Sequence, residues 1–308
     1  MVTHVQLREV GLRDGLQIID TIVPTATKIE WIHREHEAGI TEIEVCSFVP
    51  ARLMPQFADS EEVVKTSLQV PGLTVSALIP NMRGAQRGVE LGIHKLNYVM
   101  SVSESHNLAN VRRTSLESLD DFRAIANMVH AIPKAQRPTI CAGLSTAFGC
   151  TIEGAVSEDR VVELTRQLLD AGADEIVIAD TVGYANPVAV RRVFKRVLEI
   201  SGQLPVAAHF HDTRGLGLAN SFSALEIGVR YFDATLAGLG GCPHAPGATG
   251  NVVMEDLSFL CESMGFETGV NLERLIEIRT LLAQALPRSR LAGAIGVAGT
   301  PKNYQPIK

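Results

Sequence analysis

The most constraining feature of the sequence is a regular alternation of short apolar runs and longer stretches with helical spacing. Eight runs containing β-branched residues are each followed by such a stretch. Alternating strands and helices indicate parallel βαβ units, and eight is the number of strands that closes a TIM barrel. The expected strands are residues 5–10, 43–46, 73–79, 95–101, 139–145, 175–179, 206–210 and 231–236.

Two architectures fit strands that alternate with helices in this way: a closed barrel and an open sheet. An open doubly wound sheet is the competing architecture, but no GxGxxG motif follows the first run, which disfavours its dinucleotide-binding version. We therefore predict one α/β TIM-barrel domain over residues 1–308, with the barrel at about 3–286 and a C-terminal extension over the barrel from about 287 to 308. The expected helices are residues 27–38, 61–68, 84–91, 116–130, 158–171, 187–200, 218–227 and 252–264.

Composition excludes several classes of protein. The net charge of −6 argues against a nucleic-acid binder, although a local group of basic residues can still hold a small anion. No apolar run approaches the ~18 residues of a membrane span, and no leader segment is visible. Five cysteines, an odd number, indicate a reducing compartment. We expect a cytoplasmic enzyme that binds neither nucleic acid nor membrane.

Polar residues stand where the predicted strands end, and this is where barrel enzymes carry their active sites. They are scattered along the chain but would converge in space. These residues are Arg13, Asp14, Glu44, Asp180, His209, His211, Cys242 and Asn251.

The pair His209 and His211 is the most informative local signal. Residues i and i+2 of a strand point to the same face, so both imidazoles would face the barrel mouth. Two histidines alone are equally consistent with a structural role. Asp14 and Asn251, which follow other strands, add two oxygen ligands and favour a divalent ion: Mg²⁺ or Mn²⁺ first, with Zn²⁺ or Co²⁺ as further options.

Other polar residues near these ends have two readings each. Arg13 forms either a surface ion pair or a clamp for a developing oxyanion, and the position beside a metal favours the clamp. Asp180 either orients a catalytic group or caps its loop, while Asp212 is expected to cap the following helix. Cys242, in the glycine-dense segment 238–243, is a candidate acid/base, and the other four cysteines are expected in the core.

Several motifs together resemble the 3-hydroxy-3-methylglutaryl-CoA lyases, a family of the TIM-barrel metallolyases. The resemblance extends over about residues 3–286, and the glycine-rich segment is its most specific part. The motifs are residues 11–17 (GLRDGLQ), 43–49 (IEVCSFV), 209–213 (HFHDT) and 237–243 (AGLGGCP), followed by Gly250-Asn251 and Glu255-Asp256.

The resemblance implies a role for each matching residue. Asp14, His209, His211 and Asn251 resemble the metal ligands, with Glu255 behind them. Arg13 resembles the residue that stabilises the acetyl-CoA enolate, Glu44 the carboxylate that supports the metal and proton transfer, and Cys242 the acid/base. Gln17, Asn110 and Arg112 are expected to contact an acyl-CoA substrate. The implied reaction is a retro-aldol-type cleavage to acetyl-CoA and a keto acid such as acetoacetate.

The sequence departs from the family pattern at positions that concern the substrate. Ile18, Ile19 and Asp20 replace Asn-Glu-Lys, and Leu108 and Ala109 replace paired basic residues, so Arg112 and Arg113 are alternatives for phosphate contacts or simply a solvated helix start. His244 and Thr151 also replace the usual residues. The apolar Ile18 and Ile19 suggest a bulkier or less acidic acyl chain.

Three other functions remain open. One is an acetyl-CoA-dependent 2-oxo acid synthase of the same superfamily, although there is no room for its usual extra domain. A second is a pyruvate-releasing aldolase, and a third is a metal-binding scaffold without catalysis. The presence of Arg13, Glu44, Cys242 and four ligands together disfavours the scaffold. Barrels of this kind often pair, so we expect a homodimer.

Overall fold

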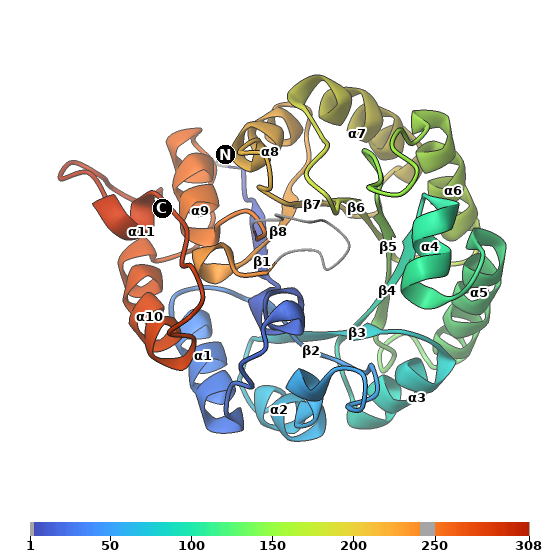
Figure 1. Ribbon diagram of the computed structural model, residues 1–308, viewed down its shortest axis with the longest axis horizontal. Coiled ribbons are helices and arrows are strands. Elements are labelled where there is room, and N and C mark those ends of the chain that lie inside the picture. The colour runs from blue at the N-terminus through green and yellow to red at the C-terminus, as the bar shows by residue number, and fades with distance from the viewer. Residues whose placement is uncertain (1–2, 241–249, 308) are drawn as a thin grey trace.

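The computed structural model describes residues 3–240 and 250–307, and its centre is a closed barrel of eight parallel strands (Figure 1). Each strand pairs with the next one in sequence, and β1 pairs with β8 to close the ring. The predicted TIM barrel is confirmed. The strands are β1 (Gln6–Glu9), β2 (Glu42–Ser47), β3 (Thr74–Ile79), β4 (Lys95–Ser101), β5 (Thr139–Ser145), β6 (Glu175–Asp180), β7 (Val206–Phe210) and β8 (Tyr231–Ala234).

The helices surround the barrel and include three that the sequence analysis did not predict. These three are α4, which follows β4, and α10 and α11 near the C-terminus. The helices are α1 (Thr25–Glu37), α2 (Ser60–Ser67), α3 (Met82–Leu91), α4 (Glu104–Val111), α5 (Ser115–His130), α6 (Glu158–Asp170), α7 (Pro187–Ser201), α8 (Gly217–Glu226), α9 (Met254–Ser263), α10 (Leu272–Ala285) and α11 (Ile295–Ala298).

Large apolar side chains fill the layer between barrel and helices. Trp31 on α1, Phe122 on α5 and Phe194 on α7 are fully buried there. Each such side chain stabilises the fold by roughly 1.5–3 kcal/mol relative to an exposed one. None of the described helices combines the length and the hydropathy that a membrane crossing requires.

The inside of the barrel holds a buried network of charges. Arg8 on β1 donates to Asp233 on β8 through Nε at 2.7 Å and also pairs with Glu175 on β6. Lys95 on β4 bonds Glu175 at 2.6 Å and Glu42 on β2 at 2.8 Å. Because buried charges are costly unless paired, these contacts tie strands on several sides of the barrel together.

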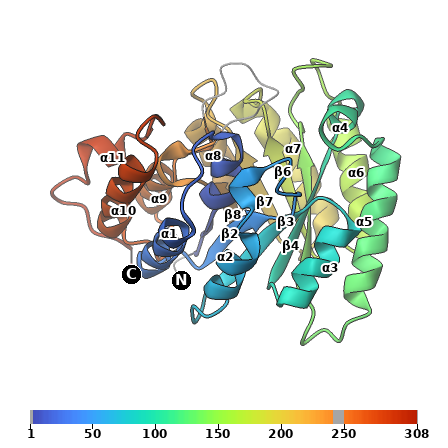
Figure 2. The ribbon, with the colours of Figure 1, turned by 60° about the horizontal axis from the view of Figure 1, so that its bottom comes forward.

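The C-terminal extension packs on the flank of the barrel, beside α9 and α10 (Figure 2). Asp256 on α9 accepts the backbone N–H groups of Ala294 and Ile295 at 2.9 and 2.8 Å. The N–H of Ala292 donates to the carbonyl of Ala237 at 2.8 Å, directly after β8. The extension therefore contacts the segment that leads out of the last strand.

Candidate active site

A cavity of about 1010 Å³ occupies the barrel interior and its C-terminal mouth. Residues from the ends of most strands line it, and it reaches down to Arg8 and Asp233 of the charge network. Catalytic sites of TIM barrels lie at this end of the strands. Of the predicted site residues, those that line the cavity are Arg13, Asp14, Gln17, Glu44, Asn110, Arg112, His209 and His211.

Asp14, His209 and His211 form a buried cluster whose ligand atoms all lie within 4.8 Å of one another. The Nε2 atoms of the two histidines are 3.1 Å apart, and Oδ2 of Asp14 lies 3.6 Å from Nε2 of His211 and 4.0 Å from Nε2 of His209. Asn251 pairs with His211 through an isolated bridge and donates from Nδ2 to Oδ2 of Asp14 at 2.7 Å. The four residues predicted as metal ligands are therefore neighbours.

Asp14 is held in place by three side chains. Its Oδ1 accepts from Arg13 at 2.6 Å and from Gln17 at 2.9 Å, and its Oδ2 accepts from Asn251. Burial alone would raise the pKa of Asp14, but Arg13 and the two histidines outweigh it and hold the pKa below its usual value. Asp14 is therefore an ionised, oriented carboxylate. Gln17, predicted to contact CoA, lines the cavity but uses its amide on Asp14.

The two histidines differ in their surroundings. His209 on β7 has its Nδ1 3.1 Å from Oδ2 of Asp233, its neighbour on β8. Burial lowers the pKa of His209, but Asp233 and Asp14 more than offset this and raise it above the usual value. Burial lowers the pKa of His211 to about 4, so this imidazole is neutral near pH 7. A neutral imidazole is the form that binds a metal.

The donor set fits a divalent ion. Ligands bound about 2.0–2.1 Å from a metal at right angles are roughly 3 Å apart, close to the separation of the two Nε2 atoms. Oδ1 of Asn251 is buried and has no partner among the described residues, which leaves an amide oxygen for the same ion. Asp233 behind His209 supplies the carboxylate–histidine pairing that fixes a ligand imidazole.

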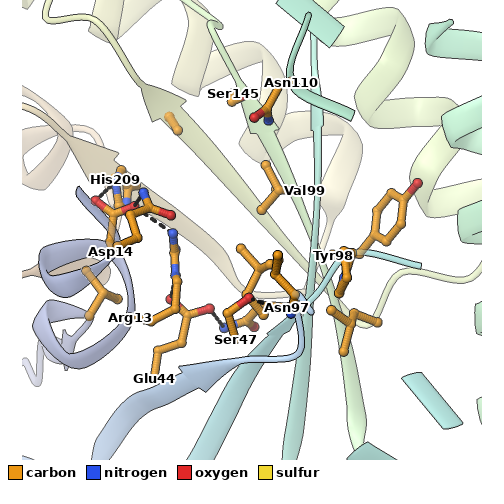
Figure 3. A pocket seen from close by; sticks show the side chains of 18 of the residues that line it. Arg13, Asp14, Glu44, Ser47, Asn97, Tyr98, Val99, Asn110, Ser145 and His209 are labelled. Atoms are coloured by element: carbon orange, nitrogen blue, oxygen red, sulfur yellow. Dashed lines mark hydrogen bonds and ion pairs between the residues drawn. The ribbon is translucent and has the colours of Figure 1, made fainter. Parts of the chain in front are cut away.

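Arg13 connects the cluster of Asp14, His209 and His211 to Glu44 (Figure 3). It lies on the π-helical turn η1 (Gly11–Gly15) after β1 and bonds Asp14 through Nη1 and Glu44 through Nε. Glu44, buried on β2, also accepts from Nδ2 of Asn97 on β4 at 2.9 Å. These two bonds fix the guanidinium of Arg13 beside Asp14. A group that stabilises a developing negative charge has to be held in place in this way.

The residues expected to contact CoA lie on the other side of the cavity, on and after α4. Asn110 lies on α4, and Arg112 ends this helix in a left-handed conformation with φ of 57°. Both line the cavity, as does Arg113, but the guanidinium of Arg113 is bonded to Asp121 at 2.5 Å. Arg112 is thus the better placed of the two arginines. Ile18 lines the cavity as well, but Ile19 packs against the core.

Asp180 and Asp212 organise loops. Asp180 accepts the N–H groups of Tyr184 at 2.8 Å and Ala185 at 3.0 Å, and it does not line the cavity. The capping alternative therefore describes its contacts better than the catalytic role, and we leave it out of the proposed chemistry. Asp212 accepts the N–H of Gly217, the first residue of α8, at 2.7 Å, but Leu216 rather than Asp212 occupies the N-cap position that was expected for it.

The turn η4 (Leu236–Gly238) follows β8 and leads toward residues 241–249, which lie outside the described part of the chain. Cys242 and His244 are among them, so the predicted role of Cys242 stays a prediction. Glu255 is fully buried at the start of α9, where it accepts the N–H of Ala237 at 3.0 Å and bonds Arg279 at 2.5 Å. It supports this turn rather than touching the metal cluster.

The remaining cysteines are buried, as expected for core residues. They are Cys46, Cys141, Cys150 and Cys261. Burial raises the pKa of Cys46 and of Cys261 to about 12, which keeps both thiols protonated and inert near neutral pH.

Three polar residues of the site were missed by the sequence analysis: Asp233, Asn97 and Glu9. Each lies within a run that was read only as a strand, and Glu9 directly follows another charged residue, Arg8. A charged or amide residue inside such a run was the available signal, because the interior of a barrel is the place where it finds partners. The partner that such a residue contacts depends on the register between the strands.

Comparison with known proteins agrees with this geometry. A family profile described as HMGL-like matches residues 4–282. The chain belongs to the HMGL-like family. Hydroxymethylglutaryl-CoA lyase YngG of Bacillus subtilis is 38% identical over 291 residues, covering 93% of this chain and 96% of that protein. The cytoplasmic 3-hydroxy-3-methylglutaryl-CoA lyase of Homo sapiens is 36% identical over 285 residues, covering 92% and 76%.

A solved structure of the same family superimposes closely on the barrel. It is an HMG-CoA lyase from Acinetobacter baumannii in complex with coenzyme A and 3-methylmalate. It has a TM-score of 0.91 and 40% sequence identity, and the match covers 99% of this HMGL-like chain and 98% of that one. The agreement over nearly the whole chain includes the C-terminal extension.

Proposed function

We propose that the protein is a divalent-metal-dependent carbon–carbon lyase that cleaves 3-hydroxy-3-methylglutaryl-CoA, or a closely related branched 3-hydroxyacyl-CoA, to acetyl-CoA and a keto acid such as acetoacetate. The observation that carries the proposal is the buried cluster of Asp14, His209 and His211 with Arg13 beside it. Family membership and the lyase names of the relatives support the reaction class.

The described residues suit the steps of such a cleavage. A divalent ion at Asp14, His209, His211 and Asn251 would acidify the substrate hydroxyl. Arg13 uses Nη1 and Nε for Asp14 and Glu44, so Nη2 remains to hold the oxygen of the thioester enolate. Glu44 fixes Arg13, and we assign to it the hydroxyl proton that leaves as the C2–C3 bond breaks. The proton that completes acetyl-CoA from the enolate comes from Cys242 or a water it controls.

The acyl group is the open part of the proposal. Ile18 at the edge of the cavity favours an apolar branch on the substrate. The related structure that holds coenzyme A and 3-methylmalate supports CoA thioesters of other branched hydroxy acids as alternative substrates. A synthase or a pyruvate-releasing aldolase would use the same metal cluster, so substrate comparison separates them from the lyase.

The test is a cleavage assay on purified protein that follows acetyl-CoA release with added Mg²⁺, Mn²⁺, Zn²⁺ or Co²⁺. We expect metal-dependent release from 3-hydroxy-3-methylglutaryl-CoA that is abolished in Cys242→Ala and in His211→Ala. His33→Ala, on the exposed face of α1, is the matched control and should keep full activity. No release, with one metal bound per chain, would move the substrate to another hydroxyacyl-CoA or to the aldolase reaction.

Two further expectations accompany the enzyme. We propose a homodimer in solution, which light scattering coupled to gel filtration checks directly. We also propose Mg²⁺ or Mn²⁺ as the bound metal and the cytoplasm as the location of the protein. Metal analysis of protein purified without added metal tests the choice of metal.

A further inference from the structure

Glu9, the last residue of β1, is fully buried and connects two turns of the site. Its Oε1 accepts the backbone N–H of Gly11 at 2.5 Å, and its Oε2 accepts the backbone N–H of Leu236 at 2.9 Å. Gly11 begins the turn η1, and Leu236 begins the turn η4. One carboxylate therefore joins a turn near the start of the chain to one that lies 225 residues later.

The turn η1 depends on this contact. The N–H groups of Arg13, Asp14 and Gly15 all donate to the carbonyl of Val10, so they are satisfied within the turn. The N–H of Gly11 donates to Glu9 instead. A Cβ atom at Gly11 would collide with Oε1 of Glu9 and approach the Trp31 ring to 3.0 Å, so only glycine fits between these two side chains.

The turn η4 also needs external support. Ala237 has φ of 58°, a left-handed conformation that is unfavourable for a residue with a Cβ atom. Two buried carboxyl groups hold the turn: Glu9 at the N–H of Leu236, and Glu255 at the N–H of Ala237. Without these bonds two buried N–H groups would lack partners, which would destabilise the turn further.

Glu35 on α1 is buried beside Glu9, and the two carboxyl groups interact with each other. Burial raises the pKa of both groups, that of Glu9 to about 8. Both oxygens of Glu9 accept backbone N–H groups. An amide of the same shape has one oxygen that accepts and one nitrogen that only donates, so it cannot make both bonds.

We propose that Glu9 is a positioning residue for the reaction. Its carboxyl group ties the turn η1, which carries Arg13 and Asp14, to the turn η4 after β8. Arg13, Asp14 and the turn η4 thereby keep fixed positions relative to one another. The kinetic part of this inference rests on the proposed lyase function, whereas its structural part does not.

The test compares two isosteric substitutions, Glu9→Gln and Glu35→Gln, in the full-length protein. In Glu9→Gln the amide nitrogen meets a backbone N–H and one of the two bonds is lost. In Glu35→Gln the carboxyl group of Glu9 keeps both bonds, so this variant is the matched control. The measurements are hydrogen–deuterium exchange of the metal-free protein, Mn²⁺ affinity by electron paramagnetic resonance, and kcat and KM for cleavage.

For Glu9→Gln we expect faster exchange in both segments 9–17 and 234–240, Mn²⁺ affinity reduced by about 10-fold or more, and a comparable loss in kcat with little change in KM. Glu35→Gln should match the wild type in all three. If Glu9→Gln does not fold, Glu9→Asp keeps the carboxyl group but shortens the reach, and it should loosen the same two segments.

Unchanged exchange in both segments of the Glu9 variants would overturn the proposal, as would equal effects of Glu9→Gln and Glu35→Gln. The exchange measurement needs neither metal nor substrate. A wild-type protein that cleaves nothing, but whose Glu9 variant loosens both turns, would refute the lyase function and leave the positioning role standing.

Discussion

Oδ2 of Asp233 lies 3.1 Å from Nδ1 of His209, and Oδ1 of the same carboxylate is held by Arg8. The carboxylate accepts the Nδ1 proton of His209 and so directs the bare Nε2 toward the metal cluster. Burial would raise the pKa of Asp233, but Arg8 and His209 keep it well below its usual range. This carboxylate therefore stays ionised and fixes both the orientation and the tautomer of His209.

Replacing Asp233 by Asn should weaken metal binding without removing a ligand. The amide cannot accept from Nδ1 and bond Arg8 as a carboxylate does, so the imidazole loses its fixed tautomer. We expect Mn²⁺ affinity to fall by about 10- to 100-fold, as measured by titration with paramagnetic detection. Affinity equal to that of the wild type would contradict the role of Asp233.

Arg13→Lys should separate metal binding from catalysis. A lysine keeps the positive charge but has no planar fork, so it cannot bond Asp14 and Glu44 and still hold an enolate oxygen. We expect kcat to fall by about 10²–10³ while Mn²⁺ still binds. Arg123→Lys on the exposed face of α5 is the control, and it should retain full kcat. A variant with normal turnover would exclude Arg13 as the clamp.

Asp180 should make folding stability depend on pH in a defined window. Burial raises its pKa from 3.8 to about 6, although the N–H groups of Ala185 and Tyr184 oppose the shift. The folded protein then holds this proton more tightly than the unfolded chain does. The resulting stabilisation is complete below pH 3.8 and is lost as the pH rises through 6.

The measurement for Asp180 is urea unfolding of the wild type and of Asp180→Asn at pH 4 and pH 7. Relative to the variant, the wild type should lose about 2 kcal/mol of unfolding free energy between the two values. The hydrogen bonds lost in the variant are present at both pH values and do not alter this difference. A constant difference between the two proteins would show that Asp180 does not titrate in this range.

Arg112→Gly should affect substrate binding alone. Glycine adopts the φ of 57° at this position without strain, so the backbone is preserved while the guanidinium is removed. We expect KM for the acyl-CoA to rise about tenfold, the worth of one charged hydrogen bond, with kcat unchanged. Arg113→Gln, whose native side chain is bonded to Asp121, should leave KM as it is. Equal effects on both would assign no special role to Arg112.

The sequence predicted the barrel because each strand and its helix leave a local pattern. The expected strand 95–101 coincides with β4, and the expected helix 187–200 differs from α7 by one residue. The turn η1 was not predicted, because its hydrogen bonds to Val10 leave no periodic signal. Helix α4 was missed since polar residues such as Ser103 and Asn107, which bond the neighbouring backbone, mask its spacing.

The site was predicted where the motif itself carries the chemistry, as with His209, His211 and Asp14. It was not predicted where a residue acts through a partner on a distant strand. Asp233 meets His209 only because β7 and β8 pair in one register, and Asn97 on β4 reaches Glu44 on β2 past the intervening strand β3. Such pairs depend on tertiary packing, which a single sequence does not reveal. Asp180 shows the reverse. It is a carboxylate at the end of a strand, but it accepts backbone N–H groups of its loop and does not line the cavity.

The turn after β8 draws its support from the whole length of the chain. Glu9 reaches it from the first strand, Glu255 from α9, and the N–H of Ala292 from the C-terminal extension. During synthesis on the ribosome, the earlier strands can pair as they emerge, but this turn cannot be completed until residue 292 has left the exit tunnel. A nascent or prematurely terminated chain would thus hold most of a barrel and no finished catalytic centre, which limits activity to full-length molecules.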